Sequence, residues 1–129
     1  MRVLLDTHAL LWWLDGAPEL SAQAKAIIAD IEANEVLVSA ASAWEIATKA
    51  RLGKLPKALT VAQRLPDVLD EQEFRLLPIT VRHGHQAGWL HNRHGDPFDR
   101  ILAAQSMLEA IPIISSDPQL KALGASVIW

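Results

Sequence analysis

The sequence predicts an α/β fold in which helices cover both faces of a mainly parallel sheet. Short apolar runs rich in Val, Leu and Ile alternate with longer segments whose apolar residues recur at helical spacing. Continuous apolar runs are typical of parallel strands, because both faces of such strands are buried. A chain of 129 residues, half of them apolar, is long enough for one hydrophobic core and short for two. We therefore expect one three-layer α/β/α domain over residues 1–129.

The order of the elements follows from these two periodicities. Five apolar runs are predicted as strands, and the segments between them carry helical stripes. The predicted strands are 2–5, 36–38, 74–79, 111–114 and 125–129. The predicted helices are 9–16, 21–34, 39–52, 60–73, 80–90, 96–108 and 117–123.

Capping residues mark the start of several of these helices. Ser21, Thr80 and Asp96 stand directly before periodic segments, and their side chains can accept hydrogen bonds from the first turn. Pro97 fills a first helical position, where its missing N–H costs nothing. Pro66 must lie in the first turn of a helix or divide the helix that contains it.

Composition excludes several kinds of protein. The chain has no cysteine, which rules out disulfides, thiolate metal sites and a cysteine nucleophile, and which fits an intracellular setting. The apolar start is interrupted by Asp6 and His8, and no small-residue cleavage site follows, so we expect no signal peptide. No apolar stretch reaches the length of a membrane span. We expect a cytoplasmic protein with no membrane partner.

The formal net charge of -3 does not by itself favour a nucleic-acid partner, because phosphate binding normally depends on Lys and Arg. Basic residues nevertheless gather in two stretches, within 49–57 and 82–100. Solvated surface and phosphate binding explain these stretches about equally well.

Acidic residues are placed where α/β proteins bind ligands. Asp6 directly follows the first predicted strand and Asp117 follows the fourth, at the sheet edge where open α/β folds bind ligands. Glu45 and Asp99 lie near the starts of two helices that could face the same edge. Converging carboxylates repel one another unless a cation is present. The pattern predicts a Mg²⁺ or Mn²⁺ site suited to phosphodiester hydrolysis.

Each acid also has a purely structural explanation. Glu45 stands three residues after Ser42, which is the spacing of a capping box. Asp96 and Asp99 fit the cap and the third position of a helix, and Asp117 precedes a proline at a typical helix start. For Asp96 the cap is the preferred explanation.

Histidines and tryptophans carry weaker signals. The histidines at 83, 85, 91 and 94 match no strong metal motif, and positions at the surface or facing RNA are favoured for them. Trp12, Trp13 and Trp44 lie in otherwise apolar helices, which favours core or interface anchors over base-stacking platforms.

Four segments carry a resemblance to a known family. They are LLDTHALLWWL, SAASAWEIATKARLGKL, HGDPFDRILAAQ and IISSD followed by the terminal VIW. In this order, and over essentially the whole chain, they resemble PIN-domain ribonucleases, specifically the VapC-type toxins of type II toxin-antitoxin pairs. The first and third segments are the specific ones. The resemblance implies a PIN-like α/β/α fold.

The resemblance also assigns site residues. It implies that the family's acidic quartet is matched by Asp6, Glu45, Asp99 and Asp117. The supporting residues that it implies are Asp96, Thr7 and Ser115. The implied activity is hydrolysis of RNA by metal-activated water, with Mg²⁺ as cofactor and Mn²⁺ as a substitute. The implied partners are RNA, a cognate antitoxin and a second copy of the chain. With this activity, contacts to the RNA backbone are predicted at Lys49, Arg51, Arg93, His94 and Arg100.

Two other functions remain open from the sequence. A phosphatase could use Asp6 as its nucleophile, although the usual second Asp two positions later is replaced by His8. A binding protein could use the same acidic cleft to hold a partner without turnover.

Overall fold

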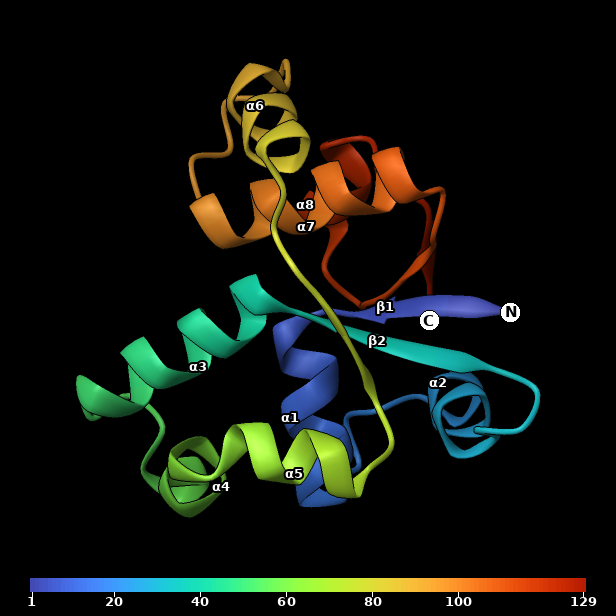
Figure 1. The fold of residues 1–129 in the computed structure, drawn as a ribbon, viewed down its shortest axis with the longest axis vertical. Helices are drawn as coiled ribbons and strands as arrows, with labels where there is room; N and C mark the ends of the chain where they lie inside the picture. The colour runs from blue at the N-terminus through green and yellow to red at the C-terminus, as the bar shows by residue number, and fades with distance from the viewer.

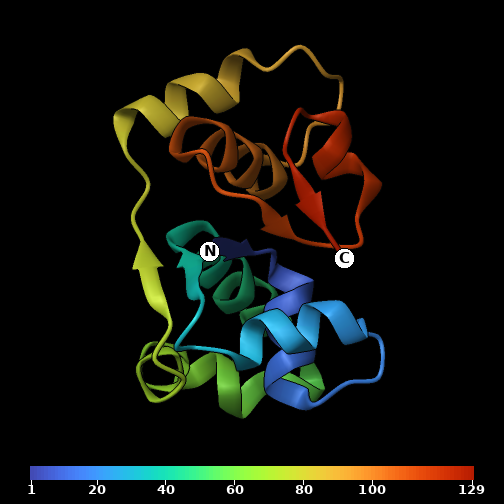
Figure 2. The ribbon, with the colours of Figure 1, turned by 90° about the vertical axis from the view of Figure 1, so that its right-hand side faces the viewer.

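A five-stranded parallel sheet forms the middle layer of the protein (Figures 1 and 2). The computed structural model describes residues 1–129, and its strands follow the order β3-β2-β1-β4-β5. Every neighbouring pair of strands is parallel. The strands are β1 (Arg2–Leu5), β2 (Glu35–Ser39), β3 (Arg75–Leu77), β4 (Ile113–Ile114) and β5 (Val127–Ile128).

Helices cover both faces of this sheet, which confirms the predicted three-layer fold (Figure 2). The first face is covered by α1 (Thr7–Asp15), α2 (Ala22–Ala29), α4 (Leu59–Gln63) and α5 (Leu65–Glu71). The second face is covered by α6 (Val81–Trp89), α7 (Pro97–Glu109) and α8 (Pro118–Ala122). Helix α3 (Ala40–Arg51) extends from the end of β2 and contacts both α1 and α7, so it bridges the two layers. None of the helices combines the length and the apolar character that a bilayer crossing requires.

Strand β1 is buried on both faces, which is why its apolar residues are consecutive in the sequence. It lies between β2 and β4, and its residues Val3, Leu4 and Leu5 are completely buried. Val3 and Leu5 belong to the core under α1 and α2, whereas Leu4 belongs to the core under α7 and α8. Successive side chains of a strand point to opposite faces, so one short run supplies both cores.

Helix α2 ends at Ala29, so the prediction that it runs to Asn34 was wrong. The Asp30 side chain accepts a hydrogen bond from the backbone N–H of Ala33, which makes a turn after the helix. The Asn34 side-chain amide donates to the carbonyl of Ile27, a group in the last helical turn. Side chains of Asp and Asn compete with the helix for backbone partners in this way.

Pro66 divides the predicted helix 60–73 in two. It lies in the first turn of α5, where no helical N–H is needed, and α4 ends before it at Gln63. A short 3₁₀ helix, η1 (Pro56–Ala58), precedes α4. Both positions that the sequence allowed for Pro66 are therefore found together, since it begins one helix and separates that helix from the one before it.

The strand order creates the ligand-binding position. Chain connections run outward from β1 in both directions, with β2 and β3 on one side and β4 and β5 on the other. The crevice between the carboxyl ends of β1 and β4 is therefore a topological switch point, where open α/β sheets bind ligands. Asp6 follows β1 and Ser115 follows β4 at this crevice.

Replacing Leu4 by Ala is expected to lower the free energy of unfolding by about 3 kcal/mol, because a buried Leu leaves a cavity that the packed core fills only in part. Urea denaturation measures the loss. The same substitution at Leu76, which lies in β3 and is 55% exposed, is the control and should change stability by less than about 0.5 kcal/mol. Equal losses at the two positions would contradict the assignment of Leu4 to the core.

Candidate active site

Asp6 joins the two strands at the switch point. As the N-cap of α1 it accepts, through Oδ1, the backbone N–H of Ala9 at 2.6 Å. Its Oδ2 accepts the hydroxyl of Ser115, which lies after β4. Asp6 is 6% exposed. A carboxylate has about four acceptor positions, so these two bonds leave Asp6 able to accept from a further donor or a cation.

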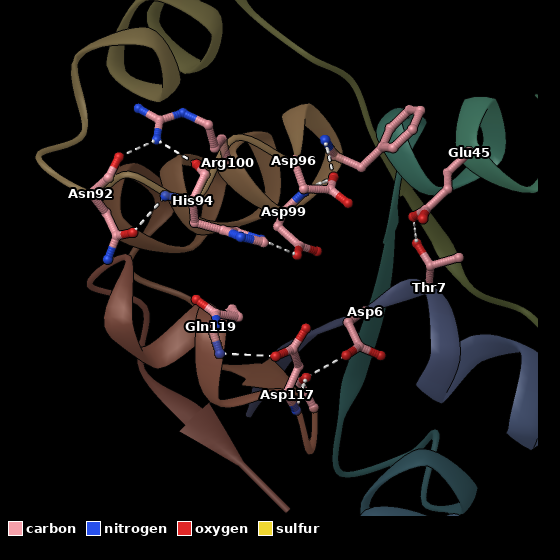
Figure 3. A network of polar contacts seen from close by, with 12 residues as sticks. Asp6, Thr7, Glu45, Asn92, His94, Asp96, Asp99, Arg100, Asp117 and Gln119 are labelled. Carbon is pink, nitrogen blue, oxygen red and sulfur yellow. Dashed lines mark hydrogen bonds and ion pairs between the residues drawn. The ribbon is translucent and has the colours of Figure 1, made fainter.

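Asp117 and Asp96 are helix caps that reach the same crevice from the second layer (Figure 3). Asp117 caps α8 by accepting the N–H of Gln119 at 2.9 Å, and its own N–H donates to Ser115 Oγ. Asp96 caps α7 by accepting the N–H groups of Phe98 at 2.8 Å and Asp99 at 3.2 Å, which confirms the predicted cap. Capping therefore fixes the position of both side chains at the crevice.

Asp99 lies in the first turn of α7 and points toward His94 in the preceding loop (Figure 3). His94 Nε2 is 2.7 Å from Asp99 Oδ2. His94, Asp96 and Asp99 each offer one atom that could bind a cation, and these three atoms lie within 4.8 Å of one another. Only Asp99 in this group belongs to the predicted quartet.

Burial makes the negative charge at this site unfavourable. Burial is the largest effect on Asp99 and raises its pKa, as do the charges of Asp96 and Asp117, while the hydrogen bond with His94 acts in the opposite direction. Burial also raises the pKa of Asp6, against the hydrogen bond from Ser115, and the charge of Asp99 raises it further. The charge of Asp99 therefore acts on Asp6, and the charges of Asp96 and Asp117 act on Asp99. Oxygen donors of this kind, together with an imidazole, are a suitable ligand set for a divalent cation.

Glu45 stands apart from this group, on α3 (Figure 3). Its Oε1 accepts the hydroxyl of Thr7 at 2.6 Å, and its Oε2 is 2.5 Å from Lys49 Nζ. Thr7 Oγ1 is also 3.0 Å from the hydroxyl oxygen of Ser42. The N-cap of α3 is Ser39, so a capping box between Ser42 and Glu45 was a wrong explanation. Both oxygens of Glu45 are engaged within the protein.

Four of the five residues predicted to contact RNA fall into two groups, and the fifth, His94, is paired with Asp99. Arg51 and Arg93 are exposed. Lys49 is paired with Glu45, and Arg100 is turned toward the chain itself. The guanidinium of Arg100 donates to backbone carbonyls of the segment 87–94, namely those of Ala87, Gly88, Leu90, Asn92 and His94. These bonds favour a structural role for Arg100 in holding the loop before α7.

His83 is buried, which makes the prediction of a surface position wrong for this residue. Its Nδ1 accepts the backbone N–H of Thr80 at 3.0 Å, so the proton on Nε2 faces Glu109 at 2.9 Å. Thr80 in turn accepts the N–H of His83, which completes a capping box. The spacing of Thr80 and His83 carried this signal, with His in the place usually taken by Glu or Gln.

The tryptophans differ in their surroundings. Trp13 donates its ring N–H to Gln72 at 2.9 Å, and Trp12 packs against Trp129 with ring centroids 5.8 Å apart. Trp44 is 62% exposed and meets Phe98 edge to face. Trp44 is therefore not a core anchor.

A parallel sheet with coupled carboxylates at its switch point defines an α/β protein with a candidate site for a divalent cation. A family model for the PIN domain matches residues 3–125. The chain belongs to the PIN-domain family, which confirms at family level the resemblance found in the sequence.

Individual relatives agree with this assignment. Ribonuclease VapC16 of Mycobacterium tuberculosis is 43% identical over a stretch that covers 54% of this chain and 50% of that protein, so the similarity spans about half of the relative's length. The solved structure of VapBC2 from Rickettsia felis bound to a promoter DNA fragment has a TM-score of 0.74 at 12% identity, covering 99% of this chain and 98% of that one. FitAcB from Neisseria gonorrhoeae has a TM-score of 0.67 at 21% identity, with 98% and 96% covered. These two structures are similar in fold.

Asp99→Asn is expected to raise the urea midpoint of the metal-free protein at pH 7. A carboxyl whose pKa is raised by folding binds its proton more tightly in the folded state. The metal-free protein therefore loses stability as the pH rises from the ordinary value of 3.8 to the raised one. Asn carries no charge and avoids this loss.

The matched control is Asp70→Asn, at an exposed position of α5. This variant should keep the wild-type midpoint. The difference in urea midpoint between Asp99→Asn and wild type should also become smaller as the pH is lowered. A lower midpoint for Asp99→Asn than for wild type at pH 7 would contradict the conclusion that the charge of Asp99 destabilises the metal-free protein.

Proposed function

We propose that this protein is the toxin endoribonuclease of a toxin-antitoxin pair, acting in the cytoplasm, and that it hydrolyses RNA phosphodiester bonds with water activated by Mg²⁺ or Mn²⁺. The observation that carries the proposal is the meeting of Asp6 and Asp99 at the switch point, where Asp6 is buried at the end of β1, Asp99 is half-buried in the first turn of α7, and the pKa of each is raised. The 43% identity to Ribonuclease VapC16 supports RNA as the substrate.

In this proposal Asp6, Asp99 and Asp117 hold the cation, with Asp96 beside them. When bound, the cation supplies the positive charge that acidifies a water and neutralises a phosphate oxygen. Ser115 holds Asp6 and Asp117 at a fixed separation, because it donates to one and accepts the N–H of the other. Asp6 and Asp117 are thus kept in place for the cation without rearrangement of the backbone.

Glu45 contributes a fourth carboxylate once it is free of Lys49. Thr7, which follows Asp6 in the chain, remains bonded to Oε1, while Oε2 is the oxygen held by Lys49. Lys49 released in this way is available to a phosphate of the substrate. The exposed residues Arg51 and Arg93 are the other proposed contacts to the RNA backbone.

The phosphatase alternative is less well supported by the geometry. Such an enzyme needs a second acid close to its nucleophile, and position 8 carries His8. The His8 ring lies 5.7 Å from the ring of Trp12 and lines an apolar groove beside α1. No carboxylate is therefore supplied where that mechanism requires one.

The partner in this proposal is a small antitoxin. Similar folds occur in a toxin-antitoxin complex from Klebsiella pneumoniae, with a TM-score of 0.67 at 20% identity. The groove beside α1 has a volume of about 340 Å³ and includes Trp12, which is consistent with the proposed role of Trp12 as an interface residue. A homodimer is also proposed, from the family resemblance.

Purified protein is expected to cleave a pool of structured RNAs with Mg²⁺ or Mn²⁺ and to lose this activity in EDTA. Asp6→Asn and Asp99→Asn should each reduce the rate at least about 100-fold, since each removes a charge that the cation needs. Gel electrophoresis of the products measures the rates. Asp70→Asn is the control and should cleave like wild type. Cleavage that survives in both site variants would eliminate the proposed mechanism.

Expression of the chain alone in its native host is expected to arrest growth, and the Asp6→Asn variant should be harmless because it lacks ribonuclease activity. Co-expression of the cognate antitoxin should restore growth. Culture density after induction measures both effects, with immunoblots to show equal amounts of protein. Normal growth in the presence of active wild-type protein would reject the role as a toxin and leave the ribonuclease activity standing. A binding module without turnover would leave RNA intact in every variant.

A further inference from the structure

We propose that His94 is a direct ligand of the cation, so that the site is a mixed nitrogen and oxygen site that favours Mn²⁺ over Mg²⁺. The inference deepens the proposed function, on which it rests for the identity of the site. It adds a residue from outside the acidic quartet and assigns a preference between the two metals.

The distances suit ligation. His94 Nε2 and Asp99 Oδ2 are 2.7 Å apart, and Asp96 offers a third ligand atom within 4.8 Å of both. Neighbouring ligands of an octahedral ion with bonds of about 2.1 Å are roughly 3 Å apart. A cation can therefore take the place of the proton between His94 and Asp99 with only a small separation of the two groups. The side chains of His94 and Asp99 are 25% and 21% exposed, so the position is reachable from solvent.

The imidazole is held at this position by its own backbone. The N–H of His94 donates to Asn92 Oδ1 at 2.8 Å, and its carbonyl accepts from Arg100 Nη1 at 2.9 Å (Figure 3). Arg100 follows Asp99 in α7, and it also binds the carbonyls of Leu90 and Asn92. The loop that carries the imidazole and the helix that carries the carboxylate are therefore joined by the residue next to Asp99, which preorganises the two ligands.

The chemistry of the donors gives the preference. Mg²⁺ selects oxygen ligands and keeps several waters, whereas first-row transition ions also accept imidazole nitrogen. Loss of the His94 nitrogen should therefore weaken Mn²⁺ binding more than Mg²⁺ binding. A histidine that only donates a hydrogen bond to Asp99 would affect both ions to a similar extent, since it would act through the shared carboxylate.

The test uses the full chain with Mn²⁺ and no RNA. Pulsed electron paramagnetic resonance of the bound Mn²⁺ should detect a directly coordinated nitrogen in wild type, and His94→Gln should abolish this signal. Titration calorimetry should show Mn²⁺ affinity falling at least about tenfold in His94→Gln, with Mg²⁺ affinity changing less than about threefold. The control is His91→Gln, at an exposed position of the same loop, which should keep the nitrogen signal and both affinities.

A wild-type spectrum without coordinated nitrogen, or equal losses of Mn²⁺ and Mg²⁺ affinity in His94→Gln, would overturn the inference. Circular dichroism establishes that the variants are folded. RNA cleavage is measured separately, so that a failure of the His94 inference can be distinguished from a failure of the proposed ribonuclease function. Metal-dependent cleavage without the nitrogen signal would reject the role of His94 alone. A nitrogen signal without any cleavage would reject the ribonuclease and leave the metal site.

Discussion

The hydrogen bond between Ser115 and Asp6 is the contact on which the arrangement of the site depends. It links the carboxyl ends of β1 and β4, the two neighbouring strands at which the chain connections diverge. Asp6 also caps α1, and Asp117 donates its N–H to the same hydroxyl while capping α8. The layers above and below the sheet are therefore joined at the place where the acids meet, and each acid is positioned by a helix end that the fold requires in any case.

The site is built against the electrostatic preference of its own residues. Asp6 is buried and Asp99 half-buried beside other acids, and removal from water raises the pKa of both. Charges that are unfavourable in the free protein become favourable once a cation is present, so binding and folding stability are coupled. Functional sites often retain such unfavourable interactions, which the rest of the core offsets. Here the completely buried residues Val3, Leu4 and Leu5 of β1 lead directly into Asp6.

Several charged residues near the site are satisfied within the chain. Lys49 binds Glu45, and Arg100 binds the loop that presents His94 to Asp99. Such pairs orient the acids. They also reduce the number of positively charged side chains that are free to bind the phosphates of RNA. The surface offered to RNA is therefore less basic than the composition of the stretches 49–57 and 82–100 indicates, and exposed residues such as Arg93 carry more of the proposed contact.

The sequence by itself determined the class of fold, the order of the strands along the chain and the caps at Ser21, Thr80 and Asp96, because periodicity and capping depend on residues close together in the chain. It also placed Asp6 and Asp117 at one edge, since both follow strands of a parallel sheet. The tertiary structure alone decided the burial of His83, the binding of the loop by Arg100 and the pairing of Glu45 with Thr7. Those partners come from different elements, and the directions of long side chains between elements are set by packing, which no local pattern in the sequence records.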